Sequence, residues 1–296
     1  MIVALGDALL DIVCQTRSPI RYGTDCFVQA TISPGGSAAN FAVWVARCGG
    51  QAGLIAKVGD DILGRLIVDD LRAKGVCTAV ARAKKPTGVT MCLVDQTGER
   101  TMFVARGATS TLCRDDLDYR LLDQARLLHV TAYSFFEDEP REAALTAMRY
   151  VKKRGGLLSL DPSSYGYLSE LGSDAFYRLA AGVDLFFPNL HEGRVLTGAE
   201  EPKDVLEALL ERFPLVALKL GSGGAIAGTR TGVHCREARK VPVADTTGAG
   251  DAFAAAFIVQ WLATGDVAAA LEAGASLAEG VIQVPGARFM AGPLPP

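Results

Sequence analysis

The chain lacks the patterns that metal sites and disulfide-stabilised folds require. Its 7 cysteines are an odd number, and no two of them form a C-x-x-C pair. A structural zinc site and a complete disulfide framework are therefore not expected, and most cysteines are predicted to be small buried residues in a reducing compartment. The 3 histidines do not form H-E-x-x-H, and the chain has neither G-x-S-x-G nor G-x-x-x-x-G-K-[ST]. The sequence thus gives no support for a zinc hydrolase, a serine hydrolase or a Walker-type phosphate loop.

Long apolar runs and an excess of one charge are also missing. No run approaches the roughly 18 apolar residues needed to cross a bilayer. The opening stretch MIVALGDALLDIV has neither a basic segment nor a cleavage site of small residues. The net charge of −3 gives no general attraction to nucleic acid or anionic lipid. We therefore expect a cytoplasmic protein that binds neither nucleic acid nor membranes.

The apolar residues that are present follow an alternating pattern. They make up 49% of the 296 residues, as in ordinary globular proteins. Short apolar runs alternate with longer helical patterns, which predicts βαβ units around a mostly parallel sheet. The predicted buried strands are 2–5, 53–58, 127–130, 157–160, 184–187 and 215–220, and the predicted helices are 38–48, 63–73, 140–154, 174–181, 203–213, 249–263 and 267–282.

Two stretches break this alternation. Residues 12–33 lack a helical period, and residues 87–107 have the pattern of two strands around a hairpin turn at 96–99. Paired with each other, they would form a small sheet beside the main one. We interpret this sheet as a discontinuous lid over the ligand-binding edge of one main domain. That main domain would comprise residues 1–11, 34–86 and 108–296.

The stretch DTTGAGDAF (245–253) places a glycine-rich turn directly before a helical apolar pattern. Gly248, Ala249 and Gly250 would supply the unpaired N–H groups of the first helical turn, where the helix dipole favours an anion such as phosphate. A carboxylate at Asp251, beside such an anion, is unfavourable unless it has a chemical task. Taking a proton from an attacking hydroxyl is such a task. The alternative is that Asp251 caps the helix and the glycines only form a tight turn.

In its context, this stretch resembles the C-terminal signature D-T-x-G-A-G-D-x-F of the ribokinase-like (PfkB) carbohydrate and nucleoside kinases. The resemblance covers nearly the whole chain, in the family's order. It includes PGGSAANFAVWVARCGG (34–50), KVGDDILGRLIVDDLRAKGV (57–76), FFPNLHEGRVLTG (186–198) and LKLGSGGAI (218–226). It implies a three-layer, doubly wound, mostly parallel α/β fold with a small β lid. It also implies ATP and Mg²⁺ as cofactors and an alcohol as the phosphate acceptor.

The resemblance implies roles for individual residues in phosphate transfer. Asp251 would be the general base, and the N–H groups of Gly248, Ala249 and Gly250 would stabilise the transferring phosphoryl group. Asn189 and Glu192 match the motif that organises Mg²⁺, mostly through water; the alternative is a capping-box pair at a helix start. The implied nucleotide-binding residues are Asn189, Lys219, Gly221, Gly224 and the segment 275–283.

A second group of matching residues would bind the acceptor. Asp11, Gly35, Gly36 and Asn40 correspond to the family residues that hold sugar hydroxyls. A missing hydroxyl would leave the carboxylate and the amide unpaired, which gives selectivity. Arg106 is a further candidate, most relevant for an acceptor that carries a carboxylate or phosphate. The alternative for Arg106 is an arginine on the lid surface.

Two positions are less regular. Lys219 stands where the commonest family pattern has threonine, so it either strengthens phosphate contact or points elsewhere. Asp245 and Thr247 stand where some relatives bind a monovalent cation, which makes K⁺ a candidate cofactor.

The predicted function is ATP-dependent phosphorylation of a hydroxymethyl group of a small fructose-, ribose- or 2-keto-3-deoxygluconate-like sugar. A homodimer through the lid is implied by the resemblance, and a nucleoside kinase of the same family stays open. An NAD(P)-dependent oxidoreductase is disfavoured because Gly250 is followed by Asp251 and no third small residue completes the dinucleotide pattern. A catalytically silent sugar-binding protein is disfavoured because Asp251, Asn189 and Glu192 are all present.

Overall fold

The computed structural model describes residues 1–16, 18–20, 22–96 and 100–289. The strands are β1 (Ile2–Leu5), β2 (Leu9–Thr16), β3 (Val28–Gly35), β4 (Ala52–Gly59), β5 (Cys77–Ala83), β6 (Val89–Val94), β7 (Arg100–Ala105), β8 (Leu127–Thr131), β9 (Leu157–Asp161), β10 (Leu185–Phe186), β11 (Leu215–Lys219), β12 (Ala225–Thr229) and β13 (Gly232–Arg236). The helices are α1 (Ser37–Arg47), α2 (Ile62–Ala73), α3 (Tyr119–Leu122), α4 (Asp138–Lys153), α5 (Tyr165–Leu171), α6 (Ser173–Leu179), α7 (Leu190–Thr197), α8 (Pro202–Leu210), α9 (Ala249–Thr264) and α10 (Val267–Val281).

The main sheet has the strand order β13-β12-β11-β10-β9-β8-β1-β4-β5. All neighbours from β5 to β11 are parallel, and β12 and β13 are antiparallel. From β1 the chain first builds outward through β4 and β5 and later returns to build outward through β8 on the other side. Such a reversal opens a crevice at the carboxyl ends of the strands, where doubly wound sheets bind ligands.

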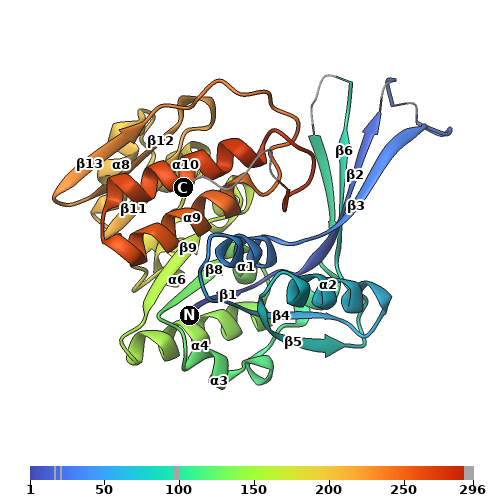
Figure 1. Cartoon of the computed structure of the whole chain (residues 1–296), viewed down its shortest axis with the longest axis horizontal. Coiled ribbons are helices and arrows are strands. Elements are labelled where there is room, and N and C mark those ends of the chain that lie inside the picture. Colours follow the sequence, from blue (N-terminus) through green and yellow to red (C-terminus); the bar gives the residue numbers. More distant parts are fainter. Residues whose placement is uncertain (17, 21, 97–99, 290–296) are drawn as a thin grey trace.

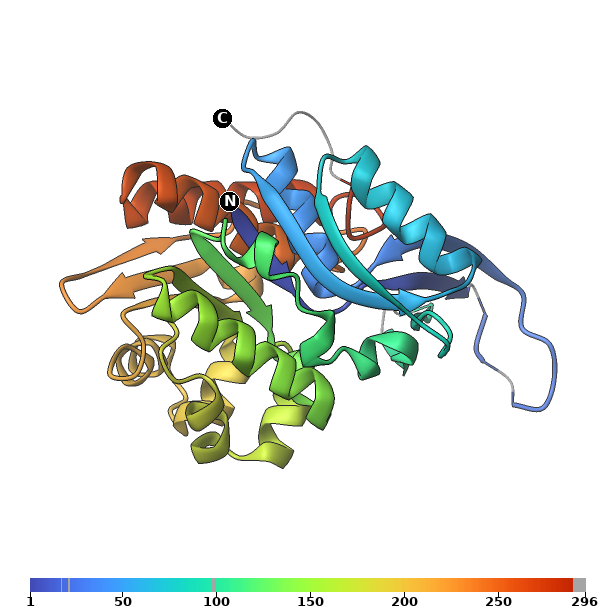
Figure 2. The ribbon, with the colours of Figure 1, turned by 90° about the horizontal axis from the view of Figure 1, so that it is seen from below.

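Helices cover both faces of the main sheet, and each face has its own apolar core. Helices α1, α2, α9 and α10 enclose one core around residues such as Trp44 and Phe257. Helices α3 to α8 enclose the other, around residues such as Phe176 and Phe186. Figure 2 shows the first group (blue, cyan and red) and the second (green to yellow) on opposite sides of the sheet. The predicted three-layer, mostly parallel architecture is therefore confirmed.

A second, smaller sheet has the strand order β3-β2-β6-β7 and stands apart from the main body (Figure 1). Its central pair, β2 and β6, is parallel, and both outer pairs are antiparallel. The small sheet predicted from 12–33 and 87–107 is thus present, although β2 already begins at Leu9 and β3 extends to Gly35. Of the hairpin turn predicted at 96–99, residues 97–99 lie outside the described residues. The division into a main domain and a lid stays a prediction.

Most predicted elements are confirmed, and those that the pattern missed are short or lie at edges. Strands β5 and β13 are edge strands whose residues are largely exposed or half-buried, so they lack a continuous apolar run. Strand β12 is buried but rich in small residues, and α3, α5 and α7 are too short to show a full amphipathic period. Among the helices of the described residues, none combines the length and apolar character that a membrane span needs.

Candidate active site

The predicted site residues come together at the carboxyl edge of the main sheet. Lys219 is the last residue of β11, and Asn189 follows β10 and bridges to Lys219. Helix α9 begins at Ala249, immediately after the glycine turn, with Gly248 as its N-cap residue. Parallel strands and the helix start therefore converge on one crevice, as the strand order requires.

Asp251 lies in the first turn of α9, but both of its oxygens accept hydrogen bonds from α1. Ser37 Oγ donates to Oδ1 (2.6 Å), and Asn40 Nδ2 donates to Oδ2 (3.1 Å). Burial raises the pKa of Asp251 to about 7, and nearby Asp161 acts in the same direction, against the two hydrogen bonds. A carboxyl group with this pKa exchanges a proton near neutral pH, which is the property that a general base requires.

The glycine turn excludes a side chain at Gly248 and lies close to Lys219 at Gly250. Gly248 has a left-handed backbone (φ 75°), and a Cβ atom there would lie 2.6 Å from Ala287 Cβ. A Cβ atom on Gly250 would lie 3.3 Å from Lys219 Nζ, so the ammonium group sits directly beside the helix start. Of the predicted anion-binding amides, Ala249 N–H already makes a long hydrogen bond (3.3 Å) to Thr246 O.

Lys219 is held by a buried carboxylate that the sequence analysis did not select. Its Nζ lies 2.7 Å from Oδ2 of Asp161, and the N–H of Ser163 donates to the other oxygen, Oδ1 (2.9 Å). Burial alone would lower the pKa of Lys219, but Asp161 and Glu192 raise it overall. The lysine therefore stays charged and is directed at the first turn of α9.

Asn189 and Glu192 form a reciprocal pair at the start of α7. The N–H of Asn189 donates to Glu192 Oε2 (2.8 Å), and the N–H of Glu192 donates to Asn189 Oδ1 (2.9 Å), so the capping-box interpretation is confirmed as geometry. Glu192 is nevertheless buried, and burial, with Asp161 beside it, raises its pKa to about 7. Helix capping does not require a buried glutamate beside a second acid, and this arrangement is unfavourable because burial penalises the charged form. Capping alone therefore does not account for Glu192.

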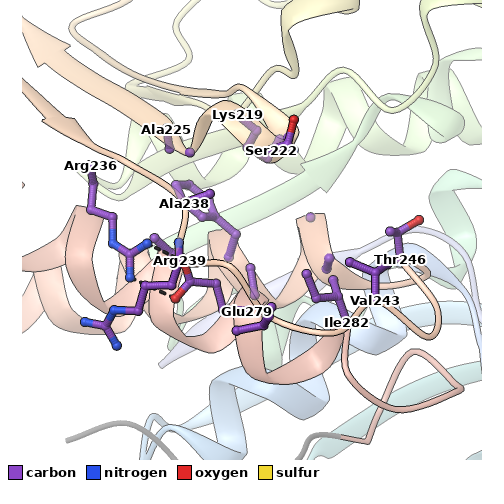
Figure 3. A pocket seen from close by; sticks show the side chains of 18 of the residues that line it. Lys219, Ser222, Ala225, Arg236, Ala238, Arg239, Val243, Thr246, Glu279 and Ile282 are labelled. Carbon is purple, nitrogen blue, oxygen red and sulfur yellow. Dashed lines mark hydrogen bonds and ion pairs between the residues drawn. The ribbon is translucent and has the colours of Figure 1, made fainter.

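A cavity of about 790 Å³ opens between β11, β12, α9 and α10 (Figure 3). This volume lies in the range of cofactor and ligand pockets. The predicted residues that line it are Asn189, Lys219, Gly221, Gly224, Ala249 and Gly250, with Ala275, Ala278, Glu279 and Ile282 from the segment 275–283. Arg236 and Arg239 flank Glu279 at one end of the cavity: Arg236 NH2 donates to Glu279 Oε2 (2.8 Å), and Arg239 N–H to Oε1 (2.6 Å).

The predicted acceptor residues lie together, beside α1. A Cβ atom on Gly35 would lie 1.9 Å from Asp11 Oδ2, and one on Gly36 2.5 Å from Asp7 O, so both glycines are required by space. Burial raises the pKa of Asp11 to about 6, against the opposing charge of Arg288. Asn40, in the first turns of α1, reaches Asp251 directly. The acceptor group and the candidate base are thus joined by a hydrogen bond.

Arg106 is not a surface arginine, because its side chain is only 13% exposed. Its guanidinium lies 3.0 Å from Asp7 Oδ1 and 2.7 Å from Glu137 Oε2, and it stacks over Phe136 at 5.4 Å. The alternative of a lid-surface position is therefore wrong. Two carboxylates already compensate its charge, so an anionic acceptor would have to compete with them.

The residues of the candidate cation site stabilise the loop before α9. Asp245 Oδ1 accepts hydrogen bonds from Thr247 N–H (2.9 Å) and Thr247 Oγ1 (2.6 Å), and Oδ2 accepts one from Gly286 N–H (3.0 Å). These bonds connect the glycine turn to the loop after α10. A monovalent cation at this place stays a prediction.

Among the residues that contact the predicted site residues, Asp161, Ser37 and Arg288 were missed. Asp161 directly follows the predicted strand 157–160, so its position at the carboxyl edge was a usable signal. Ser37 lies inside the quoted glycine signature but has no motif of its own. Arg288 follows the last predicted helix, and nothing in its local sequence indicates that it is buried against Asn40.

The fold and the site define a class: a doubly wound α/β protein with a cavity of small-molecule size and a buried carboxylate beside it at a helix start. The particular family is given by comparison with known proteins. The chain belongs to the pfkB family of carbohydrate kinases, whose family model matches residues 1–292. The predicted family, and with it the predicted transfer of phosphate to an alcohol group of a carbohydrate, is confirmed.

Individual relatives support the same family. The chain is 36% identical over 244 residues to the ATP-dependent ribose-1-phosphate kinase of Halopiger xanaduensis, covering 81% of this chain and 77% of that protein. It is 29% identical over 293 residues to the 2-dehydro-3-deoxygluconokinase of Thermoproteus tenax, covering 96% and 89%. The crystal structure of adenosine kinase from Sinorhizobium meliloti superposes with a TM-score of 0.88 at 26% identity, covering 97% of this chain and 95% of that chain.

Proposed function

We propose that the protein transfers the γ-phosphoryl group of ATP to a hydroxymethyl group of a small sugar, with Asp251 as general base. The observation that supports this most is the position of Asp251 between two sites. Its helix start, at Ala249 and Gly250, lines the cavity, and its carboxylate contacts Asn40 of the acceptor group. A base at this junction can take the proton of an acceptor hydroxyl as that oxygen attacks the phosphorus. Positioning and electrostatics then suffice without a covalent phosphoenzyme.

Charge on the transferring phosphoryl group would be stabilised from two sides. The N–H groups of Gly248, Ala249 and Gly250 lie at the positive end of the α9 dipole, and Ala249 would exchange its long bond to Thr246 O for the phosphoryl oxygen. The Lys219 ammonium, beside Gly250, adds a full positive charge. Asp161 fixes the direction of this ammonium group and thereby aims it at the phosphate position.

Magnesium fits the carboxylates near the phosphate position. Asp161 and Glu192 are both buried, and Asp161 raises the pKa of Glu192, so a nearby cation would offset part of the cost of holding these carboxylates together. Oxygen ligands and water suit Mg²⁺, which keeps several waters when it binds nucleotide phosphates. Bound there, Mg²⁺ would neutralise charge on the phosphates. Asp245 and Thr247 are the proposed site of a monovalent cation such as K⁺.

We favour a neutral polyol as acceptor. The relatives above are named for ribose 1-phosphate, 2-dehydro-3-deoxygluconate and adenosine, so their names do not single out one acceptor. Asp11 and Asn40 offer a carboxylate and an amide to hydroxyl groups. Arg106, the predicted partner of an acidic group, is already paired with two carboxylates. A fructose- or ribose-like sugar fits this charge balance better than an acidic sugar, and a neutral nucleoside is the alternative.

The remaining parts of the proposal concern the whole chain. The small sheet, residues 12–33 and 87–107, would close over the acceptor and exclude water, which limits wasteful hydrolysis of ATP. The main domain, residues 1–11, 34–86 and 108–296, would carry both binding sites. Two copies would meet through the small sheet, and dependence on ATP agrees with a cytoplasmic location.

The test is ADP release from Mg·ATP with a panel of ketoses, aldoses, 2-keto-3-deoxy acids and nucleosides. We expect activity on one class, and a loss of about 100- to 10,000-fold in Asp251→Asn, because a general base contributes that much. The matched control is Asp69→Asn, an exposed aspartate on α2, which should keep full activity. ATP binding without turnover on any acceptor would support a silent binding protein and contradict the proposal.

A further inference from the structure

We propose that Arg288, in the loop after α10, is a positioning residue that fixes the amide of Asn40 so that its NH₂ group faces Asp251. The inference rests on the proposed role of Asp251 as the general base. It assigns a function to residues 284–289, which the predicted kinase motifs do not include.

The contacts form a direct relay from Arg288 to the base. Arg288 is 3% exposed, and its Nε donates to Asn40 Oδ1 (2.8 Å). Asn40 Nδ2 in turn donates to Asp251 Oδ2 (3.1 Å). The oxygen of an amide only accepts hydrogen bonds and its nitrogen only donates them. A donor at Oδ1 therefore determines which end of Asn40 faces the carboxylate. With the amide reversed, two acceptors would face each other at Asp251.

The guanidinium is itself held at two further points. Its NH2 atom donates to Gly35 O (3.0 Å), at the end of β3, and its NH1 atom donates to Asp70 Oδ2 (2.5 Å), on α2. Because the donors of arginine are fixed in one plane, partners on three elements leave a single orientation. The same side chain thus links the small sheet, α2 and the amide beside the base.

The backbone that carries Arg288 is anchored next to the glycine turn. Trp44 Nε1 donates to Ala287 O (2.9 Å), and Gly286 N–H donates to Asp245 Oδ2 (3.0 Å). Ala287 also occupies the space that a side chain at position 248 would need. The loop therefore packs against the start of α9, and this packing also places Arg288 beside Asn40.

The effect on the base follows from the charges around it. Ser37 and Asn40 of α1 donate hydrogen bonds to Asp251, and the charges of Lys219 and Asp161 at the strand ends act on it. Tyr133 and Arg288 also interact electrostatically with it. Loss of Arg288 removes one positive charge and frees the Asn40 amide to reverse. Both changes raise the pKa of Asp251, because both make its ionised form less favourable. The acid limb of the pH profile should move to higher pH.

The experiment compares Arg288→Gln and Arg288→Lys with Arg47→Gln in full-length protein. Arg47 is the matched control, because its NH1 donates to the backbone O of Arg288 (2.8 Å) and so anchors the same loop outside the relay. In Arg288→Gln we expect kcat to fall about 10- to 100-fold, as for loss of a buried charged hydrogen bond. The acid limb of kcat should shift upward, while KM for ATP changes less than about twofold. Arg288→Lys should recover part of both effects, and Arg47→Gln should show neither.

The outcomes separate the inference from the proposed function. Wild-type protein without acceptor-dependent ADP release would refute the kinase proposal itself. An active wild type with an unshifted acid limb in Arg288→Gln would refute the inference, as would a loss of kcat equal to that of Arg47→Gln. If Arg288→Gln does not fold, Arg288→Met, which also removes the charge and the donor to Asn40 Oδ1, carries the same test, and an unshifted limb in that variant has the same meaning. A double-mutant cycle with Asn40→Ala should show less than additive losses, because both changes interrupt one relay.

Discussion

Burial of the Asp251 carboxylate lowers the stability of the folded protein at neutral pH, and it also gives the candidate base a raised pKa. Its pKa is raised from the ordinary value of 3.8 to about 7, chiefly by burial. The folded protein therefore binds this proton more tightly than the unfolded chain does. Proton binding by Asp251 therefore contributes to the free energy of unfolding. This contribution is fully present below the unfolded pKa, near 4, and is lost as the pH rises through the folded pKa, near 7. Function and stability are opposed at this residue.

This opposition predicts how the stability of Asp251→Asn depends on pH. The free energy of unfolding of the variant relative to wild type should increase with pH by up to about 1.4 kcal/mol per unit between about pH 4 and about pH 7, then level off. The slope is independent of any constant change in hydrogen bonding, which makes it a clean readout. Urea denaturation across this range measures it, with the exposed Asp69→Asn as control. A difference that does not vary with pH would show that the carboxyl group titrates normally.

The sequence allowed the prediction of site residues that belong to short motifs, and it failed for residues that act across the fold. Asp251 and its glycines were predictable because the anion site and the base lie on one helical turn. Arg288 reaches Asn40 from a position 248 residues away in the chain, and no local pattern specifies such a contact. Arg106 was predicted as a candidate, but its pairing with Asp7 and Glu137 depends on how three separate segments meet.

At the scale of elements, the Lys219 ammonium group lies among several carboxylates, which are brought together by the ends of β9 and β11 and the start of α7. Lys219 Nζ pairs with Asp161, and Glu192 and Asp251 also stabilise its charge. We expect Lys219→Met to lower the free energy of unfolding by about 3 kcal/mol or more above neutral pH, because it leaves buried charges uncompensated. The loss should be smaller in acid, where the carboxyl groups take up protons. Denaturation at both pH values tests this.

Two further variants sharpen that test. Lys152→Met removes an exposed lysine paired with Asp184, and it should cost no more than about 1 kcal/mol. The double variant Lys219→Met with Asp161→Asn should recover much of the lost stability, because the unpaired charge disappears with its partner. Equal losses at both pH values, or no recovery, would mean that the packing of the lysine stem matters more than its charge.

Elements were predictable where burial produces a pattern. The strands at 2–5 and 157–160 are continuous apolar runs because helices cover both faces of a parallel sheet. Edge strands such as β13 have no such requirement, and α7 is short because Gly198 ends it in a left-handed turn (φ 73°). The sequence pattern therefore described the interior of the main sheet well and its margins poorly.

At the scale of the whole molecule, the small sheet has two different faces. The strand register aligns Ile32, Ile12, Met91 and Phe103 in one row across all four strands. Asp11, next to Ile12 on β2, lies on the opposite face because side chains alternate along a strand. The apolar row therefore faces away from the acceptor group. It is largely uncovered in one copy of the chain, because Ile32 is 62% exposed and Phe103 58%. An uncovered apolar face of this kind indicates an association surface.

This row leads to the prediction that two copies associate through it, which a single charge should prevent. A two-fold axis would bring the row of one copy against the same row of the other, so Phe103→Lys would place two ammonium groups in the contact. We expect the wild type to have the mass of a dimer and Phe103→Lys that of a monomer by size-exclusion chromatography with light scattering. Val233→Lys, at a position of similar exposure (51%) on β13 of the main sheet, should leave the dimer intact. A monomeric wild type, or a variant that remains dimeric, would show that the exposed row is not the association surface.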